Sequence, residues 1–423
     1  MKENTLHYLW LHKRINVNQL FTTKGEKIEI LNFGQYLQAS GPDFFNAQLI
    51  IGNQKWAGNI EMHIKSSDWY LHHHETDVAY DNVILHVVWE NDTEIYRSNN
   101  SEIPVLELKY FVENAEIFKI NQLLTTKKWI NCENLIEFVD DFTFENWKER
   151  LFLERLEEKT DFILEVFEEN DKNWETTCFI LLAKNFGLNV NGDSFYKMAQ
   201  NIPITVLRKE AIEIENLEAL FFGSLDLLNV ENDFEYSKRL NEIWNYQKKK
   251  YKLSEIKTAN VQFFKLRPDN FPTIRLAQLA SVYYQYQNVF SEIINFKNVI
   301  DIYNFFDLKT SNYWQQHYNF RSKTTKKKNN ISKSFIELLI INTIVPLKFA
   351  YLKSIKSDDC ESLIEFLKSI KPEKNTTIEN FKSLNIHIES AFDSQAMLHL
   401  KKNYCDNKKC LNCAIGLKIL NKI

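Results

Sequence analysis

The chain has 423 residues and a mass of 50.3 kDa, and 44% of its residues are hydrophobic. This length predicts two to three domains, and the apolar fraction is sufficient for a large hydrophobic core. Glycine occurs 9 times and proline 7 times, whereas average usage would give about 30 glycines and about 20 prolines. This scarcity argues against turn-rich all-β folds, and the chain contains neither glycine-rich phosphate loop, GxGxxG or GxxxxGK[ST]. We therefore expect a mostly helical globular protein.

The net charge of −4 is unevenly distributed along the chain. Residues 321–423 carry 19 basic and 10 acidic side chains, a charge of +9, which leaves −13 for residues 1–320. A basic segment of this kind is typical of proteins with an acidic partner, and nucleic acid is the candidate here. Lysine-rich helices with a solvated face have the same composition, so this alternative stays open.

The sequence predicts neither export nor membrane insertion. The first twenty residues contain no continuous apolar stretch of the kind found in secretory signals. The most apolar window, residues 335–351, is interrupted by Glu337, Asn342, Pro346 and Lys348, so we expect a buried helix there. Six cysteines, three of them in the last nineteen residues, do not make a disulfide framework. The expected location is the cytoplasm.

The first 112 residues have the features of a small domain with a mixed sheet. Five of the nine glycines lie in the first 60 residues, and a helix is predicted at residues 3–14. Strands are predicted at 27–33, 47–51, 58–64, 82–89 and 105–108. The run Asn82–Trp89 is apolar enough for a strand buried on both faces, and residues 51–54 resemble a hairpin turn.

Beyond Tyr110 the apolar residues recur every three to four positions, which is the helical period. Helices are predicted at 142–170, 174–186, 214–228, 234–250, 273–288, 335–352, 360–370 and 393–402. Long polar loops are predicted at 254–260 and at 319–332, the second with Lys323 and Lys326–Lys328. The predicted class is α+β, with a small α/β domain (1–112), a large helical domain (113–398) and a cysteine-rich segment (399–423) packed on the helical domain.

Ionisable residues are densest in the N-terminal domain. Glu61 and His63 are two residues apart on a predicted strand, so both side chains emerge on the same face. The hairpin would bring Asp43 beside them, and two carboxylates with a nitrogen base can hold Mg²⁺ or Mn²⁺ and activate a water. In the structural alternative, Asp43 caps a turn, Glu61 forms a buried salt bridge and the histidines are satisfied core or surface residues. Taken alone, a run such as His72–His74 is more often a solvated loop than a set of ligands.

These motifs resemble the core of the PD-(D/E)XK nucleases, the restriction-endonuclease-like fold, in which a Pro-Asp and an (Asp/Glu)-x-Lys lie on adjacent strands. The chain has Pro42-Asp43 and Glu61-Met62-His63. His63 stands where that family has lysine, and Lys65 follows on the same face two residues later. The resemblance implies Asp43 and Glu61 as metal ligands and His63 as a base or phosphate contact, with His86 or Lys65 nearby.

A second candidate site lies near the C-terminus. Cys410-x-x-Cys413 is the arrangement with which two thiolates hold one ion, and four residues separate Cys405 from Cys410. His399 is a candidate fourth ligand for Zn²⁺, and a [4Fe–4S] cluster requires a further cysteine. The distant cysteines are Cys132, Cys178 and Cys360. Three reduced thiols where the last helix docks are the alternative.

Two further segments carry residues that bind phosphate or bases in other proteins. Arg267 and Arg275 flank a helix start with Pro272 in its first turn, where they bind a phosphate or pair with the acidic helix around residues 154–161. The aromatic segment 311–320 adjoins the lysine run, as in proteins that bind single-stranded nucleic acid. Packing between helices explains the same aromatic residues.

Taken in order, the motifs of this chain resemble a bacterial family described as domain of unknown function 2851. The resemblance covers nearly the whole chain and brings no established activity or site residues. Its segments are Gly41–Phe44, Gly58–His63, Ser67–Trp69, Val83–Val88, Leu217–Gly223, Arg267–Ala280, Asn342–Pro346 and Tyr404–Gly416.

Three functions follow as hypotheses. The first is a divalent-metal-dependent phosphodiesterase that acts on nucleic acid, with Asp43 and Glu61 on the metal and with the basic C-terminal third giving sequence-independent affinity. The second is a non-catalytic binding or scaffold protein with a structural zinc or iron–sulfur site. The third is a redox or iron–sulfur sensor that depends on the C-terminal cysteines. The sequence does not separate DNA from RNA and does not give the oligomeric state.

Overall fold

The computed structural model describes residues 1–37, 41–126, 128–228, 234–255, 261–321, 323, 330–357 and 361–422. Cys360, Lys326–Lys328 and most of the predicted loop 254–260 lie outside the described residues. The chain divides into two compact units, one formed by residues 1–147 with 400–423 and the other by residues 148–399. The domain boundary expected at residue 112 falls inside the first unit, and the C-terminal segment belongs to that unit.

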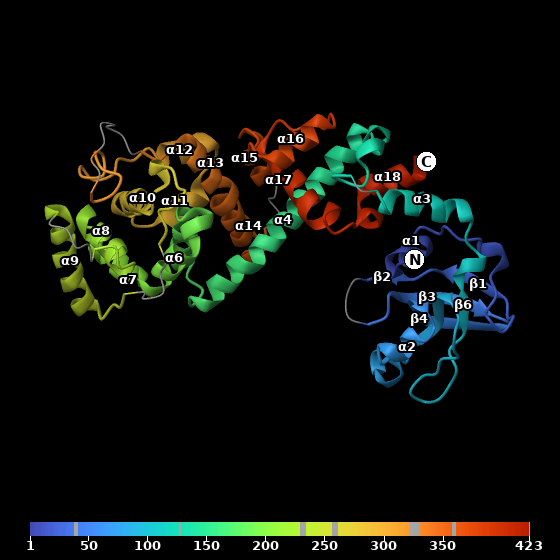
Figure 1. The fold of residues 1–423 in the computed structure, drawn as a ribbon. Coiled ribbons are helices and arrows are strands. Elements are labelled where there is room, and N and C mark those ends of the chain that lie inside the picture. Colours follow the sequence, from blue (N-terminus) through green and yellow to red (C-terminus); the bar gives the residue numbers. More distant parts are fainter. Residues whose placement is uncertain are drawn as a thin grey trace. The chain divides into compact units, whose positions relative to one another are not determined.

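The first unit is built on a mixed sheet, which has six strands in the part of the chain that the structure describes (Figure 1). The strands are β1 (Ile28–Asn32), β2 (Gln35–Tyr36), β3 (Phe44–Ile51), β4 (Gln54–Lys65), β5 (Val83–Glu90) and β6 (Val105–Glu107). Their order is β1-β3-β4-β5-β6, and β2 pairs with β3. The β1–β3, β2–β3 and β3–β4 pairs are antiparallel, whereas β4–β5 and β5–β6 are parallel. The mixed sheet predicted from the sequence is therefore confirmed.

Two glycines fix the middle of this sheet. At the β3–β4 hairpin, Ile51 pairs with Gln54, and Gly52 takes the left-handed conformation (φ +60°) that the tight turn requires. At Gly58, a Cβ atom would lie 2.5 Å from Cγ2 of Ile84 on β5. Because glycine has no side chain, β5 can approach β4 this closely.

Helices and single turns cover the sheet and extend the first unit. The helices are α1 (Glu3–Leu11), α2 (Asp68–Leu71), α3 (Asn114–Leu124) and α18 (Ala414–Lys422), and the single turns are η1 (Val17–Gln19), η2 (His74–Thr76), η3 (Val78–Tyr80), η4 (Leu108–Tyr110), η5 (Glu133–Phe138), η8 (Leu400–Cys405) and η9 (Cys410–Asn412). Figure 1 shows α1 and α2 on opposite sides of the sheet, and both contact β4. Leu9 and Trp10 of α1 join Met62 of β4 in the main hydrophobic core of this unit.

The regular elements of the second unit are all helices in the part of the chain that the structure describes. Its elements are α4 (Asp141–Glu169, which begins in the first unit), α5 (Trp174–Phe186), α6 (Leu188–Asn201), α7 (Ile204–Glu210), α8 (Ile214–Ser224), α9 (Glu235–Tyr251), η6 (Pro268–Asn270), α10 (Pro272–Gln285), α11 (Val289–Asn295), α12 (Val299–Phe305), α13 (Lys333–Leu339), η7 (Ile340–Ile344), α14 (Val345–Ser354), α15 (Glu361–Lys368), α16 (Thr376–Ser383) and α17 (Ala391–His399). The long amphipathic helices agree with the sequence prediction. Helix α6, with 14 residues, was not predicted. The short helices α7, α11, α12 and α16 were not predicted either, because fewer than three turns give a weak periodic signal.

One helical run, residues 333–354, is long and apolar enough to cross a membrane. In its most apolar window, 72% of the residues are buried inside the protein, as in a core helix of a soluble protein. Lys348, in the middle of this run, is buried and donates hydrogen bonds to the carbonyl oxygens of Ile294 (2.9 Å) and Phe296 (3.0 Å) at the end of α11. The run therefore packs on protein, as the sequence predicts.

A buried ion pair joins α4 to α17 within the second unit. The Lys148 ammonium, 2% exposed, lies 2.9 Å from Oδ1 of Asp393 and 2.9 Å from the His387 carbonyl oxygen. Oδ2 of Asp393 accepts the Ser390 backbone N–H at 3.0 Å. Burial opposes ionisation of Asp393, but the hydrogen bonds from Lys148 and Ser390 outweigh it and keep the pKa of Asp393 below its usual range.

Replacing Asp393 with Asn should destabilise the second unit strongly. The substitution removes the counter-charge that Asp393 gives the buried Lys148 ammonium, for which we expect a loss of about 3 kcal/mol in the free energy of unfolding. The control is Glu168→Gln, because the Glu168–Lys172 pair is more than 60% exposed on both sides and should contribute less than about 0.5 kcal/mol. Urea denaturation followed by circular dichroism measures both; equal effects of the two substitutions would contradict this assignment.

Candidate functional site

Strands β3 and β4 hold Asp43 and Glu61 in a fixed relation. Asp43 directly precedes β3, whose first residue, Phe44, pairs with Ile60 of β4. The Asp43 backbone N–H donates to Oε2 of Glu61 at 3.1 Å, and Oδ2 of Asp43 accepts the Met62 backbone N–H at 3.0 Å. The hairpin therefore brings the two predicted carboxylates together, as the sequence spacing indicated.

His63 lies on the same face of β4 as Glu61 and is 1% exposed. Its Nδ1 is 2.8 Å from Nε2 of His86, which β5 places beside it, and its Nε2 is 3.1 Å from Nδ1 of His72. His63 Nε2 also lies 3.5 Å from Oε1 of Glu61. Both ring nitrogens of His63 are therefore engaged with other potential ligands.

The connection between β4 and β5 supplies two more histidines. After α2 the chain turns through His73, which takes the left-handed conformation (φ +61°), and this turn directs His72 and His74 toward His63. One ring nitrogen from each of His63, His72 and His74 lies within 4.8 Å of the other two. Oε1 of Glu61 lies 3.5 Å from Nε2 of His74, whereas the His73 side chain is 83% exposed. The sequence analysis favoured a solvated loop here.

Helix α1 contributes two residues to the same site. Nε2 of His7 lies 3.1 Å from Oδ2 of Asp43, and the other ring nitrogen of His7 lies 3.3 Å from the Tyr36 hydroxyl. Oε1 of Glu3 lies 4.0 Å from Nε2 of His63. Neither Glu3 nor His7 was predicted to belong to a site. Their spacing in the sequence indicates that both lie on the same side of the helix, because residues four apart on a helix share one face.

Burial and neighbouring groups favour the uncharged forms of Glu61, His63 and His86. Burial, and then the neighbouring Asp43 carboxylate, raise the pKa of Glu61 to about 9. Burial, and then the proximity of His86, lower the pKa of His63 to about 2. Burial lowers the pKa of His86 to about 3. Neutral imidazole is the form that binds metal ions, so the His63 ring is held in its ligand form.

The surrounding side chains hold the histidine rings in place. Tyr80 stacks on His74 with ring centroids 3.7 Å apart, and the Trp69 ring packs edge-on against His74 and His86. Trp69 and Tyr80 belong to a small hydrophobic cluster with Val83 of β5. The connection that carries the two histidines is therefore anchored to the sheet by its own core.

A network of polar contacts fixes the start of this connection. The Ser66 hydroxyl donates to Oδ1 of Asp92, which follows β5, and in return accepts the Asp92 backbone N–H, each at 2.9 Å. The backbone N–H of Lys65 donates to Oδ2 of Asp68. The Lys65 residue itself is exposed at the end of β4. The structure therefore gives His63, and not Lys65, the buried position beside the carboxylates.

The C-terminal cysteines lie in the first unit, together with Cys132. Burial, the main cause, raises the pKa of Cys405, and the thiols of Cys413, Cys132 and Cys410 contribute to that increase because they lie close to it. Asn131 Nδ2 is 3.6 Å from the Cys410 sulfur. Cys178 lies in α5 of the second unit, so Cys132 joins the C-terminal cysteines.

His399, the other candidate fourth ligand, has different neighbours. It is the last residue of α17 and is 2% exposed. Its two ring nitrogens lie 3.5 Å from Glu154 and 3.9 Å from Glu158, both on α4. Cys132 and the C-terminal cysteines belong to the first unit. His399 belongs to the second unit and faces these two carboxylates there.

Arg275 neither lies at an open phosphate site nor pairs with the acidic helix around residues 154–161. It is 4% exposed, donates to Oδ1 of Asn270 (2.5 Å) and to Oε1 of Gln278 (2.7 Å), and lies 3.4 Å above the Phe335 ring. The predicted helix start at Pro272 is confirmed. Burial lowers the pKa of Arg275 to about 9, so this residue braces the helical core.

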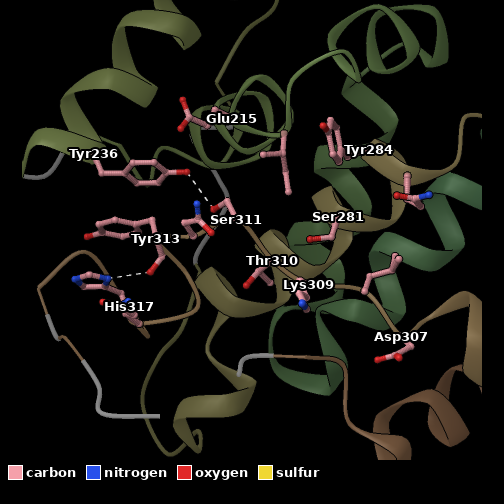
Figure 2. Close-up of a pocket in the computed structure, with 15 residues that line it drawn as sticks. Glu215, Tyr236, Ser281, Tyr284, Asp307, Lys309, Thr310, Ser311, Tyr313 and His317 are labelled. Carbon is pink, nitrogen blue, oxygen red and sulfur yellow. Dashed lines mark hydrogen bonds between the residues drawn. The ribbon is translucent and has the colours of Figure 1, made fainter. Parts of the chain in front are cut away.

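The aromatic segment 311–320 borders a cleft of about 920 Å³ in the second unit (Figure 2). Tyr313 stacks between Tyr236 and His317, with ring centroids 4.1 Å and 4.0 Å apart. The His317 ring is oriented by its contact with the Tyr313 carbonyl oxygen, at 2.9 Å. Trp314 is fully buried and stacks on Phe222. Part of this segment therefore fills the core, and the remainder lines the cleft.

The chain was compared with known families, curated proteins and solved structures. The profile of a family described as "Protein of unknown function (DUF2851)" matches residues 3–376. No curated protein and no solved structure matches the chain. The function must therefore be argued from the geometry of the site.

A buried carboxyl group lies behind the cleft. Glu218 of α8 is completely buried, and its Oε2 accepts hydrogen bonds from Nε1 of Trp314 (3.0 Å) and from the Tyr236 hydroxyl. Burial raises the pKa of Glu218 to about 7 in spite of these hydrogen bonds. A raised pKa means that the folded protein prefers the protonated form.

Glu218 should make the second unit lose stability as the pH rises. Protonated Glu218 stabilises the folded state, and this contribution to the free energy of unfolding is fully present below the ordinary glutamate pKa of 4.5. It is lost as the pH rises through about 7, a change of about 3 kcal/mol. The difference in unfolding free energy between wild type and Glu218→Gln should therefore change by this amount between pH 4.5 and pH 8. Glu215→Gln, in the same helix but paired with Arg239, is the control; a flat difference for Glu218→Gln would refute the argument.

Proposed function

We propose that this chain, which belongs to the DUF2851 family, is a divalent-metal-dependent phosphodiesterase that acts on nucleic acid. One observation carries the proposal: His63, His72 and His74 each offer a ring nitrogen within 4.8 Å of the others, and Glu61 approaches two of them at 3.5 Å. Ring nitrogens that converge from a strand and a loop beside a buried carboxylate are typical of a metal centre.

The ligand atoms, three ring nitrogens and a carboxylate, determine which metal ions suit the site. Three imidazoles with a carboxylate suit Mn²⁺, Zn²⁺ or Fe²⁺, whereas Mg²⁺ prefers oxygen ligands and keeps much of its water. Of the two ions expected from the sequence, Mn²⁺ therefore fits this site better than Mg²⁺. A bound divalent ion lowers the pKa of a coordinated water and polarises a phosphoryl oxygen.

The protein's own residues orient the ligands and manage protons. His86, at 2.8 Å from Nδ1 of His63, fixes the ring orientation of that ligand, as outer partners of metal-bound histidines do. His7 lies 3.1 Å from Asp43, and this contact holds the second carboxylate in place. Asp43 and Glu3, beside the histidines, are the candidate bases that accept a proton from the attacking water.

Two features support nucleic acid as the substrate class. Asp43 directly precedes β3, Glu61-x-His63 lies on the antiparallel neighbour β4, and β4 pairs in parallel with β5, which is compatible with the nuclease-like core that the motifs resemble. Residues 321–423 carry a charge of +9, which favours binding to a phosphate backbone. His63 is buried and stands where the nucleases that the motifs resemble have lysine. Its burial beside the carboxylates favours a role for His63 as a metal ligand or base.

Cleavage of linear DNA and RNA in the presence of Mn²⁺ tests the activity. We expect the wild type to cut at least one of the two and Glu61→Gln to be at least about 100-fold slower, because a ligand is neutralised without a change of shape. His74→Ala should behave like Glu61→Gln. His73→Asn is the matched control, because the neighbouring His73 side chain is exposed and Asn tolerates its left-handed backbone. No cleavage by folded wild type on either polymer would overturn the proposal in favour of a binding or scaffold protein.

Binding of Mn²⁺ tests the site without reference to a substrate. Titration followed by the electron paramagnetic resonance of free Mn²⁺ should show one tight ion per chain, and His63→Ala should weaken its affinity about 100-fold or more. Mn²⁺ is a suitable probe, because it prefers nitrogen and oxygen ligands to thiolates. Equal binding by wild type and by a His63→Ala, His72→Ala, His74→Ala triple variant would show that the ion sits elsewhere.

A further inference from the structure

The C-terminal cysteines and Cys132 form a group that the proposed hydrolytic site does not use. Cys132 directly precedes η5, and both η5 and α3 contact α18. Cys132 and Cys410 pack against the same hydrophobic core, which also contains Leu411 and Leu420. Residues separated by more than 270 positions in the sequence are thus brought to one place in the first unit.

We propose that Cys132, Cys405, Cys410 and Cys413 hold an iron–sulfur cluster of the [4Fe–4S] type. Four cysteine thiolates are the usual ligand set of such a cluster. Three of them come from one short segment with the spacing Cys-x₄-Cys-x₂-Cys, and the fourth comes from a distant part of the chain. This site is separate from the histidine site and does not depend on the function proposed for it.

The four thiols affect one another electrostatically. Burial, and then the thiols of Cys413 and Cys410, raise the pKa of Cys132 to about 12. Burial raises the pKa of Cys413 to about 11, and Cys410 contributes to that increase. The sulfur atoms therefore lie in one part of the first unit.

The spacing of the sulfur atoms favours a cluster over a single zinc ion. Four thiolates around one Zn²⁺, each about 2.3 Å from the metal, stand about 3.8 Å apart. Among the residues that the structure describes, the histidine group is the set of donors that converges closely enough for a single ion, and the cysteines do not form such a set. A cluster of four irons and four sulfides is wider than one ion, so its cysteine ligands stand further apart.

The surroundings supply hydrogen bonds to the sulfur atoms, which anionic cluster ligands need. Asn131 donates to the Cys410 sulfur at 3.6 Å, and the backbone N–H groups of Ile415 and Gly416 donate to Cys413. A Cβ atom at Gly416 would lie 2.1 Å from the Cys410 carbonyl oxygen. Glycine at this position therefore allows the cysteine loop to lie directly against α18. Hydrogen bonds to the sulfurs are among the features that tune such clusters.

The position of the cysteines in the chain gives the cluster a structural role. The chain leaves the first unit after Trp147 and returns at Leu400, and the cysteines lie on both sides of this inserted segment. A bond between Cys132 and Cys405 through the cluster closes the loop that contains the whole second unit. Closing a long loop lowers the entropy of the unfolded chain. The cluster therefore acts as a clamp that fastens the C-terminal segment to the N-terminal part.

The experiment is purification of the full chain without air, followed by iron, acid-labile sulfide and zinc analysis. We expect a brown protein with about four irons and four sulfides per chain, absorption near 400 nm and an electron paramagnetic resonance signal after reduction by dithionite. A colourless protein with one zinc, a protein without metal, or a protein with two irons would each overturn the assignment.

Single variants identify the ligands. Cys132→Ala and Cys410→Ala should each lose most of the iron. Two controls should retain it: Cys178→Ala, because this buried cysteine belongs to the second unit, and His399→Ala, because this histidine faces Glu154 and Glu158. If His399→Ala loses iron and Cys132→Ala keeps it, the fourth ligand is the histidine and the proposal is wrong. Because metal content is measured on the wild type as well, a variant that fails to fold leaves the test intact.

Discussion

The central constraint in the first unit is the position of β4 between an antiparallel and a parallel neighbour. Antiparallel pairing with β3 needs only a two-residue turn, and it places Asp43 beside Glu61. Parallel pairing with β5 needs a connection that returns to the starting edge of the sheet. That connection passes over the face on which Glu61 and His63 emerge, and it carries His72 and His74. The histidine group is therefore a direct result of the strand topology.

This topology also buries ionisable side chains, which lowers the stability of their charged forms. Glu61 and His63 are almost completely buried, and a second carboxylate lies beside them. Burial favours their neutral forms and costs stability whenever either one ionises alone. A divalent cation reverses that balance, because it stabilises the carboxylate and binds neutral imidazole. Polar side chains occupy buried volume here that hydrophobic side chains could fill, and buried polar groups of this kind are typical of functional sites.

Local patterns in the sequence predicted part of this arrangement. The β-branched run of β5, the Gly52 turn and the alternation of Glu61 and His63 each report on nearby backbone, so strand, hairpin and shared face were all predictable. The direction of His72 and His74 was not, because it depends on the left-handed turn at His73. The partner of the C-terminal cysteines was open for another reason: nothing local distinguishes Cys132 from Cys178, and long-range packing decides between them.

The two proposed sites lie in one unit and use different donor atoms, and this difference decides which metals suit each site. Nitrogen and oxygen donors at Glu61, His63, His72 and His74 accept Mn²⁺, Zn²⁺ or Fe²⁺, whereas four thiolates select iron–sulfur clusters or zinc. Zinc and iron thus suit both sites, but Mn²⁺ is a poor competitor for the thiolates, so Mn²⁺ can load the histidine site separately. The thiolate site closes the loop around the inserted second unit, and the histidine site lies on the sheet that this closure supports. Loss of the cluster should therefore act on the hydrolytic centre through the stability of the unit, because none of its ligands belongs to that centre.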